Sequence, residues 1–242
     1  MLLATLAAAG AAGGVRQAHA SDAPLVVLVD GSIEMPQALV QDGKVLDGLQ
    51  YHLALELGQR LSRTIHFRPV PRRRIAQLLA EGRQADLICN YLPGWLPGPL
   101  HWSRPYLDDA DLLVTAARHP APAQLRDVAG QRIGTVAGFF YPEAEAQLGA
   151  GFVRDDATNL IASLRKLASG RMDHALVGRL TFEYWQRRGD IPLDVHPPLV
   201  VARLRTACAL SPHSSLPLAQ LDAAIGALQA DGSLARIVER SR

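Results

Sequence analysis

Lysine, cysteine and aromatic residues are all scarce in this chain of 242 residues. Among 25 basic residues only Lys44 and Lys166 are lysines, and 23 acidic residues leave a net charge of +2. No block of like charge forms a basic face for nucleic acid, and we interpret the arginine excess as codon bias. Two cysteines, Cys89 and Cys208, are too few for a disulfide scaffold or a four-ligand zinc site.

Long apolar runs are also missing, since no segment reaches the roughly 18 uninterrupted apolar residues of a membrane-spanning helix. The Leu- and Ala-rich stretch 2–12 and the triplet Ala18-His19-Ala20 instead predict a signal peptide over residues 1–20. The alternative is a disordered leader on a cytoplasmic protein, because no basic residue precedes the apolar stretch. A cleaved signal predicts a periplasmic protein, in whose oxidising compartment the two cysteines can pair.

Motifs for metals, nucleotides and covalent catalysis are absent. No histidine or cysteine stands at the spacing H-x-x-H, H-E-x-x-H or C-x-x-C. The serine-hydrolase elbow G-x-S-x-G, the P-loop and the dinucleotide motif G-x-G-x-x-G do not occur either. We therefore expect no metal and no cofactor, and nothing in the sequence supports one catalytic triad over another.

Two stretches of the chain show the same alternation of strand and helix patterns. Apolar strand patterns fall at 25–30, 65–70 and 86–91, and again at 132–136, 152–154 and 174–177. Helical patterns fall at 49–61 and 75–80, and again at 142–148 and 159–168. Strand–helix–strand order requires parallel strands with helical crossovers, so we predict two α/β lobes.

The remaining segments connect or complete these lobes. Strands are predicted at 112–115 and within 199–210, a helix at 181–188, and a long helix over 216–240 interrupted at Asp231-Gly232. The proline-rich stretch 93–99 (PGWLPGP) predicts a rigid loop.

The few aromatic residues are placed unevenly. Seven of the 13 fall in two short segments: Tyr91, Trp95, Trp102 and Tyr106, then Phe139, Phe140 and Tyr141. Both segments begin near the carboxyl end of a predicted parallel strand, where open α/β sheets bind ligands. We interpret the rings as the lining of a small-molecule pocket. The alternative is a local core beneath the proline-rich loop.

Two further features lie at predicted strand ends. Gly138 forms a strand–Gly–helix turn, whose free N–H groups suit a carboxylate or phosphate, although a glycine also simply eases a tight turn. Arg72-Arg73-Arg74 opens a predicted helix. We expect one of these arginines to point toward the pocket and the others to meet water.

Six short motifs stand in a characteristic order: Gly48-Leu49, residues 78–86 (LLAEGRQAD), 102–106 (WSRPY), 125–134 (LRDVAGQRIG), 167–173 (LASGRMD) and 228–237 (LQADGSLARI). Together they resemble the periplasmic solute-binding proteins of the polar amino-acid type, known as extracellular solute-binding family 3. The resemblance runs from about Leu25 to Arg240. It implies the type II periplasmic-binding-protein, or Venus-flytrap, fold: two α/β lobes joined by a two-strand hinge, with the solute between them.

The resemblance also implies boundaries and pairings. The crossovers fall near 107–111 and 202–205, so lobe 1 is residues 21–108 with 206–242, and lobe 2 is residues 109–205. Cys89 and Cys208 lie on strands that are neighbours in this fold, which brings the two thiols within disulfide reach.

The departures from the family concern its amino-acid clamp. Members carry an arginine in the loop after the third strand, but residues 90–101 contain none. The family's ammonium-binding aspartate falls at Gly178, and its stacking aromatic residue falls at Gln37. A standard amino acid is therefore not expected. We predict a replacement pocket formed by Glu34, Arg72, Tyr91, Trp95, Gly138, Phe139, Tyr141 and Arg179. Arg179 is expected to restore a positive charge, unless it is simply solvated.

These features predict a non-catalytic, monomeric substrate-binding protein of the periplasm, which captures a small aromatic or anionic solute. Its partner would be an ABC permease or a sensor protein, and it would meet the membrane only through that partner. One alternative is an enzyme resembling the cyclohexadienyl dehydratases, with Glu34 as the acid. Another is a degenerate relative that acts through protein contacts, with its cleft filled by its own side chains.

Overall fold

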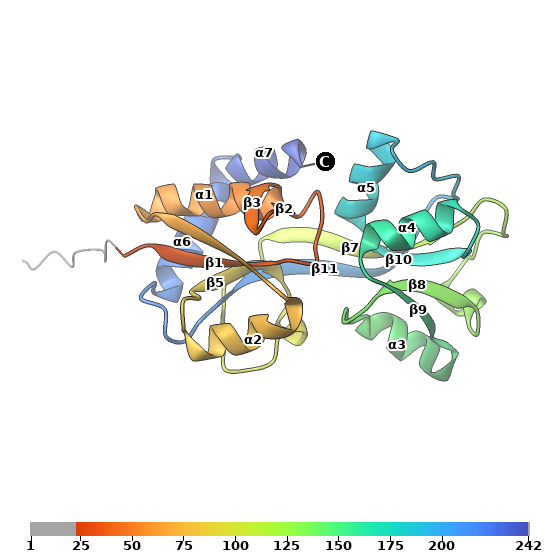
Figure 1. The fold of residues 1–242 in the computed structure, drawn as a ribbon, viewed down its shortest axis with the longest axis horizontal. Coiled ribbons are helices and arrows are strands. Elements are labelled where there is room, and N and C mark those ends of the chain that lie inside the picture. The colour runs from red at the N-terminus through yellow and green to blue at the C-terminus, as the bar shows by residue number, and fades with distance from the viewer. Residues whose placement is uncertain (1–22, 242) are drawn as a thin grey trace, which may run out of the picture.

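The computed structural model describes residues 23–241, so the predicted signal peptide lies outside the described part. Two lobes lie side by side and are joined by long strands (Figure 1). The first lobe contains strands β1 (Leu25–Asp30), β4 (Ile65–Val70) and β5 (Leu87–Tyr91) and a hairpin of β2 (Leu39–Gln41) and β3 (Lys44–Asp47). Its helices are α1 (Leu49–Leu61), α2 (Arg72–Glu81), α6 (Leu218–Ala230) and α7 (Ser233–Arg240).

The second lobe repeats the pattern with strands β8 (Arg132–Val136), β9 (Val153–Ala157) and β10 (His174–Gly178). Its helices are α3 (Pro142–Leu148), α4 (Leu160–Ala168) and α5 (Arg179–Arg188). In each lobe the first of these strands lies in the middle: β1 pairs in parallel with β4 and β5, and β8 pairs in parallel with β9 and β10, as helical crossovers require. The predicted α/β class is confirmed.

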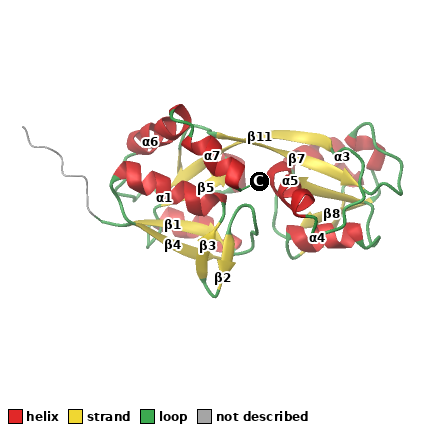
Figure 2. Cartoon of the chain, turned by 90° about the horizontal axis from the view of Figure 1, so that it is seen from above, coloured by secondary structure: helices red, strands yellow, loops and turns green. Residues whose placement is uncertain are grey.

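Two antiparallel strands, β7 (Leu107–Thr115) and β11 (Leu199–Leu210), run from one lobe into the other (Figure 2). β11 pairs with β5 and with the short β6 (His101–Trp102) in the first lobe, and β7 pairs with β10 in the second. The resulting sheet order is β4-β1-β5-β11-β7-β10-β8-β9. The lobe boundaries that we propose, 108/109 and 205/206, cut these strands where Asp108 pairs with Arg205.

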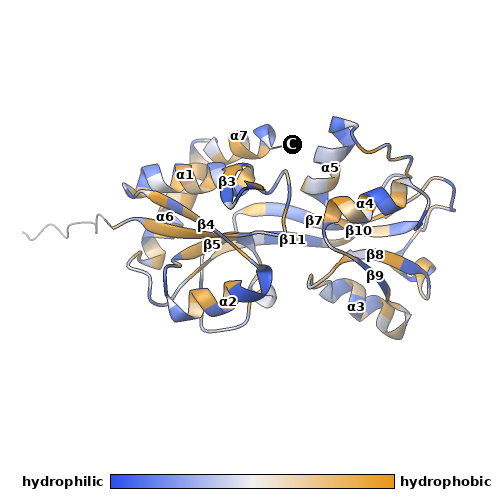
Figure 3. Cartoon of the chain, viewed as in Figure 1, coloured by the Kyte–Doolittle hydropathy of each residue, from blue (hydrophilic) through white to orange (hydrophobic). Residues whose placement is uncertain are grey.

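The helices alternate apolar and polar residues, seen as bands in the hydropathy colouring (Figure 3), and α7 packs on α1 and α6. In α1 the residues Leu49, Leu53 and Leu57, spaced four apart, are 0–2% exposed. Burying each contributes on the order of 1.5–3 kcal/mol. Ser62 caps the C-terminus of α1: it adopts the left-handed conformation, and its N–H donates to the carbonyls of Gln59 and Gly58.

Most predicted elements fall in place, and the differences are local. The helix predicted at 75–80 begins earlier, at Arg72, with Pro71 as its N-cap residue. The three arginines therefore form its first turn. The stretch 93–99 was predicted as a loop without helix, but Pro93–Trp95 forms a 3-10 turn, where a leading proline loses no hydrogen bond. The strand predicted at 112–115 starts at Leu107, and the β2–β3 hairpin adds two short strands that the apolar strand patterns do not include.

Cys89 on β5 and Cys208 on β11 form a disulfide, with their Cα atoms 3.9 Å apart. The bond joins two antiparallel neighbours within the main core of the first lobe, and both residues are buried. Within residues 23–241, none of the helices combines the length and apolar character needed to cross a membrane.

Candidate functional site

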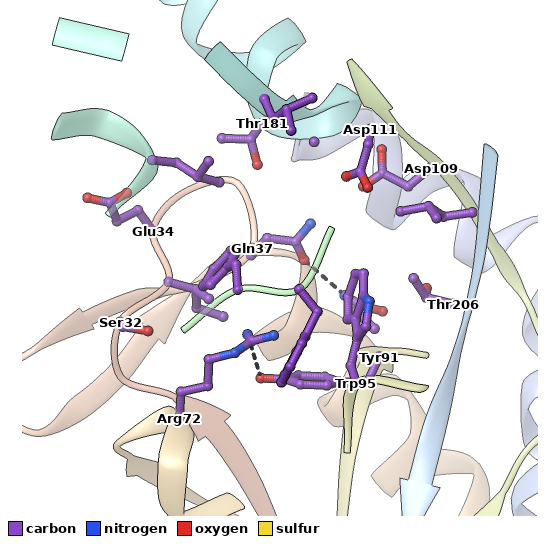
Figure 4. Close-up of a pocket in the computed structure, with 18 of the residues that line it drawn as sticks. Ser32, Glu34, Gln37, Arg72, Tyr91, Trp95, Asp109, Asp111, Thr181 and Thr206 are labelled. Carbon is purple, nitrogen blue, oxygen red and sulfur yellow. Dashed lines mark hydrogen bonds between the residues drawn. The ribbon is translucent and has the colours of Figure 1, made fainter. Parts of the chain in front are cut away.

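A cavity of about 110 Å³ lies between the lobes, and both lobes line it. Its lining follows β1, β4 and β5 on one side and β8 and β10 on the other, with β7 and β11 between them. These are the carboxyl ends of parallel strands, where open α/β sheets place ligand sites. Figure 4 shows the polar lining residues Ser32, Glu34, Gln37, Arg72, Tyr91, Asp109, Asp111, Thr181 and Thr206 around this space.

A fully buried carboxylate, Asp30, organises one wall of the cavity. It accepts hydrogen bonds from the Ser32 N–H (2.9 Å), the Ser32 hydroxyl (2.6 Å) and the Tyr91 hydroxyl (3.2 Å). It also forms an ion pair with Arg72, 3.1 Å from Nη1 to Oδ2. Burial, followed by the nearby Asp30 charge, raises the pKa of Tyr91 far above its ordinary value. Tyr91 therefore stays protonated and keeps its ring fixed against the cavity.

Arg72 is the one cationic side chain among the described residues that line the cavity, and its Nη1 donates to Asp30 and to the Tyr91 hydroxyl. Besides Asp30, its guanidinium lies 4.2 Å from the ring centroid of Phe139 and 5.4 Å from that of Tyr91. Phe139 belongs to the second lobe, so this cation–π contact crosses the cleft. Asp30 thus neutralises the positive charge of Arg72, and the rings of Phe139 and Tyr91 cover the guanidinium.

Two more contacts cross the cleft at its mouth. Glu34 Oε2 accepts a hydrogen bond from the Ile161 N–H in α4 at 3.2 Å. The Trp185 indole N–H in α5 donates to the Met35 carbonyl at 3.1 Å. Burial raises the pKa of Glu34, opposed by the Ile161 hydrogen bond and the Arg165 charge. Because these contacts join the two lobes, the structure is that of a closed cleft.

Two acids on the crossing strand β7 also face the cavity. Asp109 and Asp111 are two positions apart, which places both side chains on one face of the strand. Asp109 Oδ1 accepts the N–H groups of Ala110 (2.8 Å) and Leu180 (3.1 Å). For Asp111, no hydrogen bond or ion pair is found within the described residues. Burial, with the Asp109 charge, raises the pKa of Asp111 to about 7.

These acids lie beside the position where the family's aspartate is missing. Gly178, at the end of β10, is in register with Asp111 of β7. A Cβ placed on Gly178 would lie 3.7 Å from Asp109 Oδ2. The carboxylates of β7 therefore lie next to the position where the resemblance implies an aspartate.

Six of the predicted pocket residues line the cavity: Glu34, Arg72, Tyr91, Trp95, Phe139 and Tyr141. Gly138 does not line it and instead borders a second, outer hollow of about 780 Å³ that shares Arg72 and Trp95 with the cavity. The expectation for Arg179 needs correction. Arg179, at the first position of α5, does not line the cavity; its guanidinium donates to the Asp108 carbonyl (2.7 Å) and to Glu183 (3.4 Å), and these two acceptors hold it.

The first aromatic segment divides between the two interpretations. Tyr91 and Trp95 line the cavity, with ring centroids 6.0 Å apart. Tyr106 is 4% exposed and belongs to the core, where its hydroxyl donates to Asn90 Oδ1 at 2.6 Å. Trp102 packs against the core cluster beneath α2. Trp102 therefore belongs to the local core proposed as the alternative, whereas Tyr106 belongs to the main core of the first lobe.

Sequence reasoning missed several polar residues of the cavity: Gln50, Asn90, Asp109, Asp111, Thr181 and Thr206. Gln37, noted only for what it replaces, accepts a hydrogen bond from Asn90 Nδ2 at 3.1 Å. One signal was available, because the strand LDDADLLVT carries three acids in four positions, and the two at alternate positions, Asp109 and Asp111, are costly to bury on one face unless they serve a site. Among the described residues, no group of His, Cys, Asp and Glu could hold a metal ion.

No protein-family model matches the sequence, and no curated protein matches it. Solved structures do match, over nearly the whole chain. A histidine kinase sensor domain with similarity to periplasmic binding proteins has a TM-score of 0.75 at 20% identity, covering 90% of this chain and 95% of its own. An amino acid ABC transporter substrate-binding protein from Streptococcus pneumoniae, bound to L-arginine, has a TM-score of 0.71 at 18% identity, covering 91% and 94%.

A third structure is an ancestral amino acid-binding protein described as a precursor of cyclohexadienyl dehydratase. Its TM-score is 0.73 at 14% identity, covering 91% of this chain and 95% of its own. At such identities the likeness establishes the fold. The chain has the two-lobed type II periplasmic-binding-protein fold that its sequence motifs implied.

Proposed function

We propose that the protein binds one small solute between its lobes and presents it to an ABC permease or to a sensor protein. The cavity shared by the two lobes is the observation that carries this proposal. A ligand enclosed by both halves of a hinged molecule stabilises the closed form, so binding becomes a change of shape that a partner can read. We propose an extracytoplasmic location from the predicted signal peptide, and a monomer.

The lining favours a solute with an apolar or aromatic body. Between the polar groups, the cavity is lined by Ile33, Leu107, Leu160, Leu176 and Leu204 and by the rings of Tyr91, Trp95, Phe139, Phe140 and Tyr141. Such surfaces bind ligands mainly by burying apolar area. A standard amino acid held by its carboxylate is disfavoured, because Arg72 is already paired with the buried Asp30.

The test uses the mature chain, residues 21–242, and a broad panel of small metabolites. A ligand at about 100 times its Kd stabilises the folded state by about 2.7 kcal/mol. For a chain of this length that raises the melting temperature by roughly 5–11 °C. Trp95 lines the cavity, so binding should also change its fluorescence. The change should shrink in Trp95→Phe, where only the Trp185 indole at the contact between the lobes still reports closure, and should persist in full in Trp102→Phe, because Trp102 does not line the cavity. A panel without any shift would contradict the proposal.

A dehydratase on the same scaffold is the second candidate, and Asp111 is the observation that favours it. A carboxyl whose pKa is raised to about 7 inside a cavity is suited to act as a general acid. Glu34 is less suited, because its carboxylate is bonded to the backbone of α4. Incubation with prephenate or arogenate tests this candidate. Turnover that Asp111→Asn abolishes and Glu34→Gln retains would favour the enzyme over the binding protein.

A further inference from the structure

The charges that line the cavity are predominantly negative. Glu34, Asp109 and Asp111 are acids, and Arg72 is the cation that faces them. Since Asp30 neutralises Arg72, and Ile161 takes one oxygen of Glu34, the acids of β7 dominate the field felt by a solute. This distribution repels an anion and attracts a cation.

Of the two acids on β7, Asp109 has compensating neighbours. It accepts two backbone N–H groups, and Arg179 lies close enough to lower its pKa while Glu183 raises it, both less than burial does. Within residues 23–241, the carboxylate of Asp111 accepts no hydrogen bond and forms no ion pair. The ionisable neighbours that affect it are Asp109 and, through its own raised pKa, Tyr141. A further hollow borders Asp111 on the side away from the cavity, and it is also lined by Glu143 and the exposed Arg203.

One aromatic ring near Asp111 is also without a cation. Arg72 lies over the rings of Tyr91 and Phe139, and Arg154 lies over Tyr141. No such contact is found on Trp95 in the described part of the chain. Trp95 and Asp111 border the same two spaces, the cavity and a hollow of about 330 Å³ beside β11. Indole is the most favourable ring for a cation, and a carboxylate beside it adds a full opposite charge.

We infer that the solute is a compact organic cation, an ammonium compound without a carboxylate, whose charge lies between Asp111 and Trp95. The inference rests on the proposed solute-binding function and deepens it. It keeps the apolar or aromatic body that the cavity lining favours and replaces the anionic solute that the sequence also predicted. The cavity of about 110 Å³ limits the body to about the size of one small ring, since an engineered cavity of ~150 Å³ holds benzene.

The test uses matched probes of four to ten non-hydrogen atoms on the mature chain: alkyl- and arylammonium ions, the corresponding alcohols and the corresponding carboxylates. Calorimetry at pH 8 should show binding of one or more ammonium ions at least ten times tighter than their neutral and anionic counterparts. Asp111→Asn should remove at least tenfold of that affinity. Asp108→Asn is the control, because Asp108 is an exposed acid on the same strand, paired with Arg205 at 3.0 Å.

The pH dependence of the binding affinity gives a second test. With the Asp111 pKa near 7, its ionised fraction falls about tenfold from pH 8 to pH 6, so affinity for a permanently charged tetraalkylammonium ion should fall similarly. No histidine lines the cavity, and Asp111→Asn should abolish this slope. Equal or tighter binding of alcohols or carboxylates, or cation binding unchanged in Asp111→Asn, would overturn the inference and leave solute binding standing. If neither these probes nor the metabolite panel bind, both proposals fall.

Discussion

Breaking the disulfide between Cys89 and Cys208 should lower the melting temperature strongly, because the bond closes a long loop. The two cysteines are 119 residues apart in the sequence. In the chain-entropy description, cross-linking a loop of this length destabilises the unfolded state by about 5 kcal/mol, and measured values of about 2–4 kcal/mol are typical. At about 2–4 °C per kcal/mol for a chain of this size, reduction should lower the midpoint by roughly 4–20 °C.

The assay compares oxidised wild type with wild type reduced by a phosphine, followed by circular dichroism. Reduction leaves both sulfur atoms in the core, so the difference reports the cross-link without a cavity. Cys89→Ala/Cys208→Ala should lose somewhat more, because both side chains are at most 4% exposed and their sulfur atoms are removed. Two titratable thiols in the denatured, unreduced protein, or equal midpoints with and without reductant, would refute the reasoning.

Three further predictions concern single contacts. Arg72→Met should destabilise the fold by about 3–5 kcal/mol in chemical unfolding by leaving Asp30 buried without its cation, and Asp30→Asn/Arg72→Met should recover much of the loss; additive losses would contradict the pairing. Burial, then the His119 charge, lowers the pKa of His174, so this residue should cost the folded state stability as pH falls below the unfolded value of about 6.5. The raised pKa of Asp111 acts in the opposite direction in the same window, so the difference between the wild-type and His174→Gln melting profiles over pH 5–8 should show the His174 slope; parallel profiles would contradict it. Trp185→Phe removes the hydrogen bond to the Met35 carbonyl, worth about 0.5–1.5 kcal/mol, and should weaken solute affinity about 2–13-fold in calorimetry; unchanged affinity would show that this contact does not support closure.

The regular elements were largely predictable, because their signals are local. The spacing of Leu49, Leu53 and Leu57 predicts α1 with its observed ends, and the apolar run that begins at Leu25 predicts β1. Each pattern needs only its own residues and the period of one element. The order of those elements, with the short motifs, was then enough for the two-lobed fold.

The site was predictable only where a side chain follows directly from a strand end, as for Tyr91 and Phe139. Arg179 also follows a strand end, yet the turn into α5 directs it to the Asp108 carbonyl, which no local pattern contains. Asp111 was missed for a similar reason. Its role depends on β7 pairing with β10 opposite Gly178, a contact between residues 67 positions apart in the chain.

The disulfide and the acids of β7 together determine where the molecule can bend. Cys208 ties β11 to the first lobe up to the end of that lobe's sheet, so we expect flexing between the lobes to occur in the next few residues, which pair with β7. Asp109 and Asp111 stand opposite Leu204 and Ala202 in that very segment. A solute held by these carboxylates would therefore bind directly to the strands that form the hinge. Bound solute would restrict the movement of these hinge strands directly, without a conformational change inside either lobe.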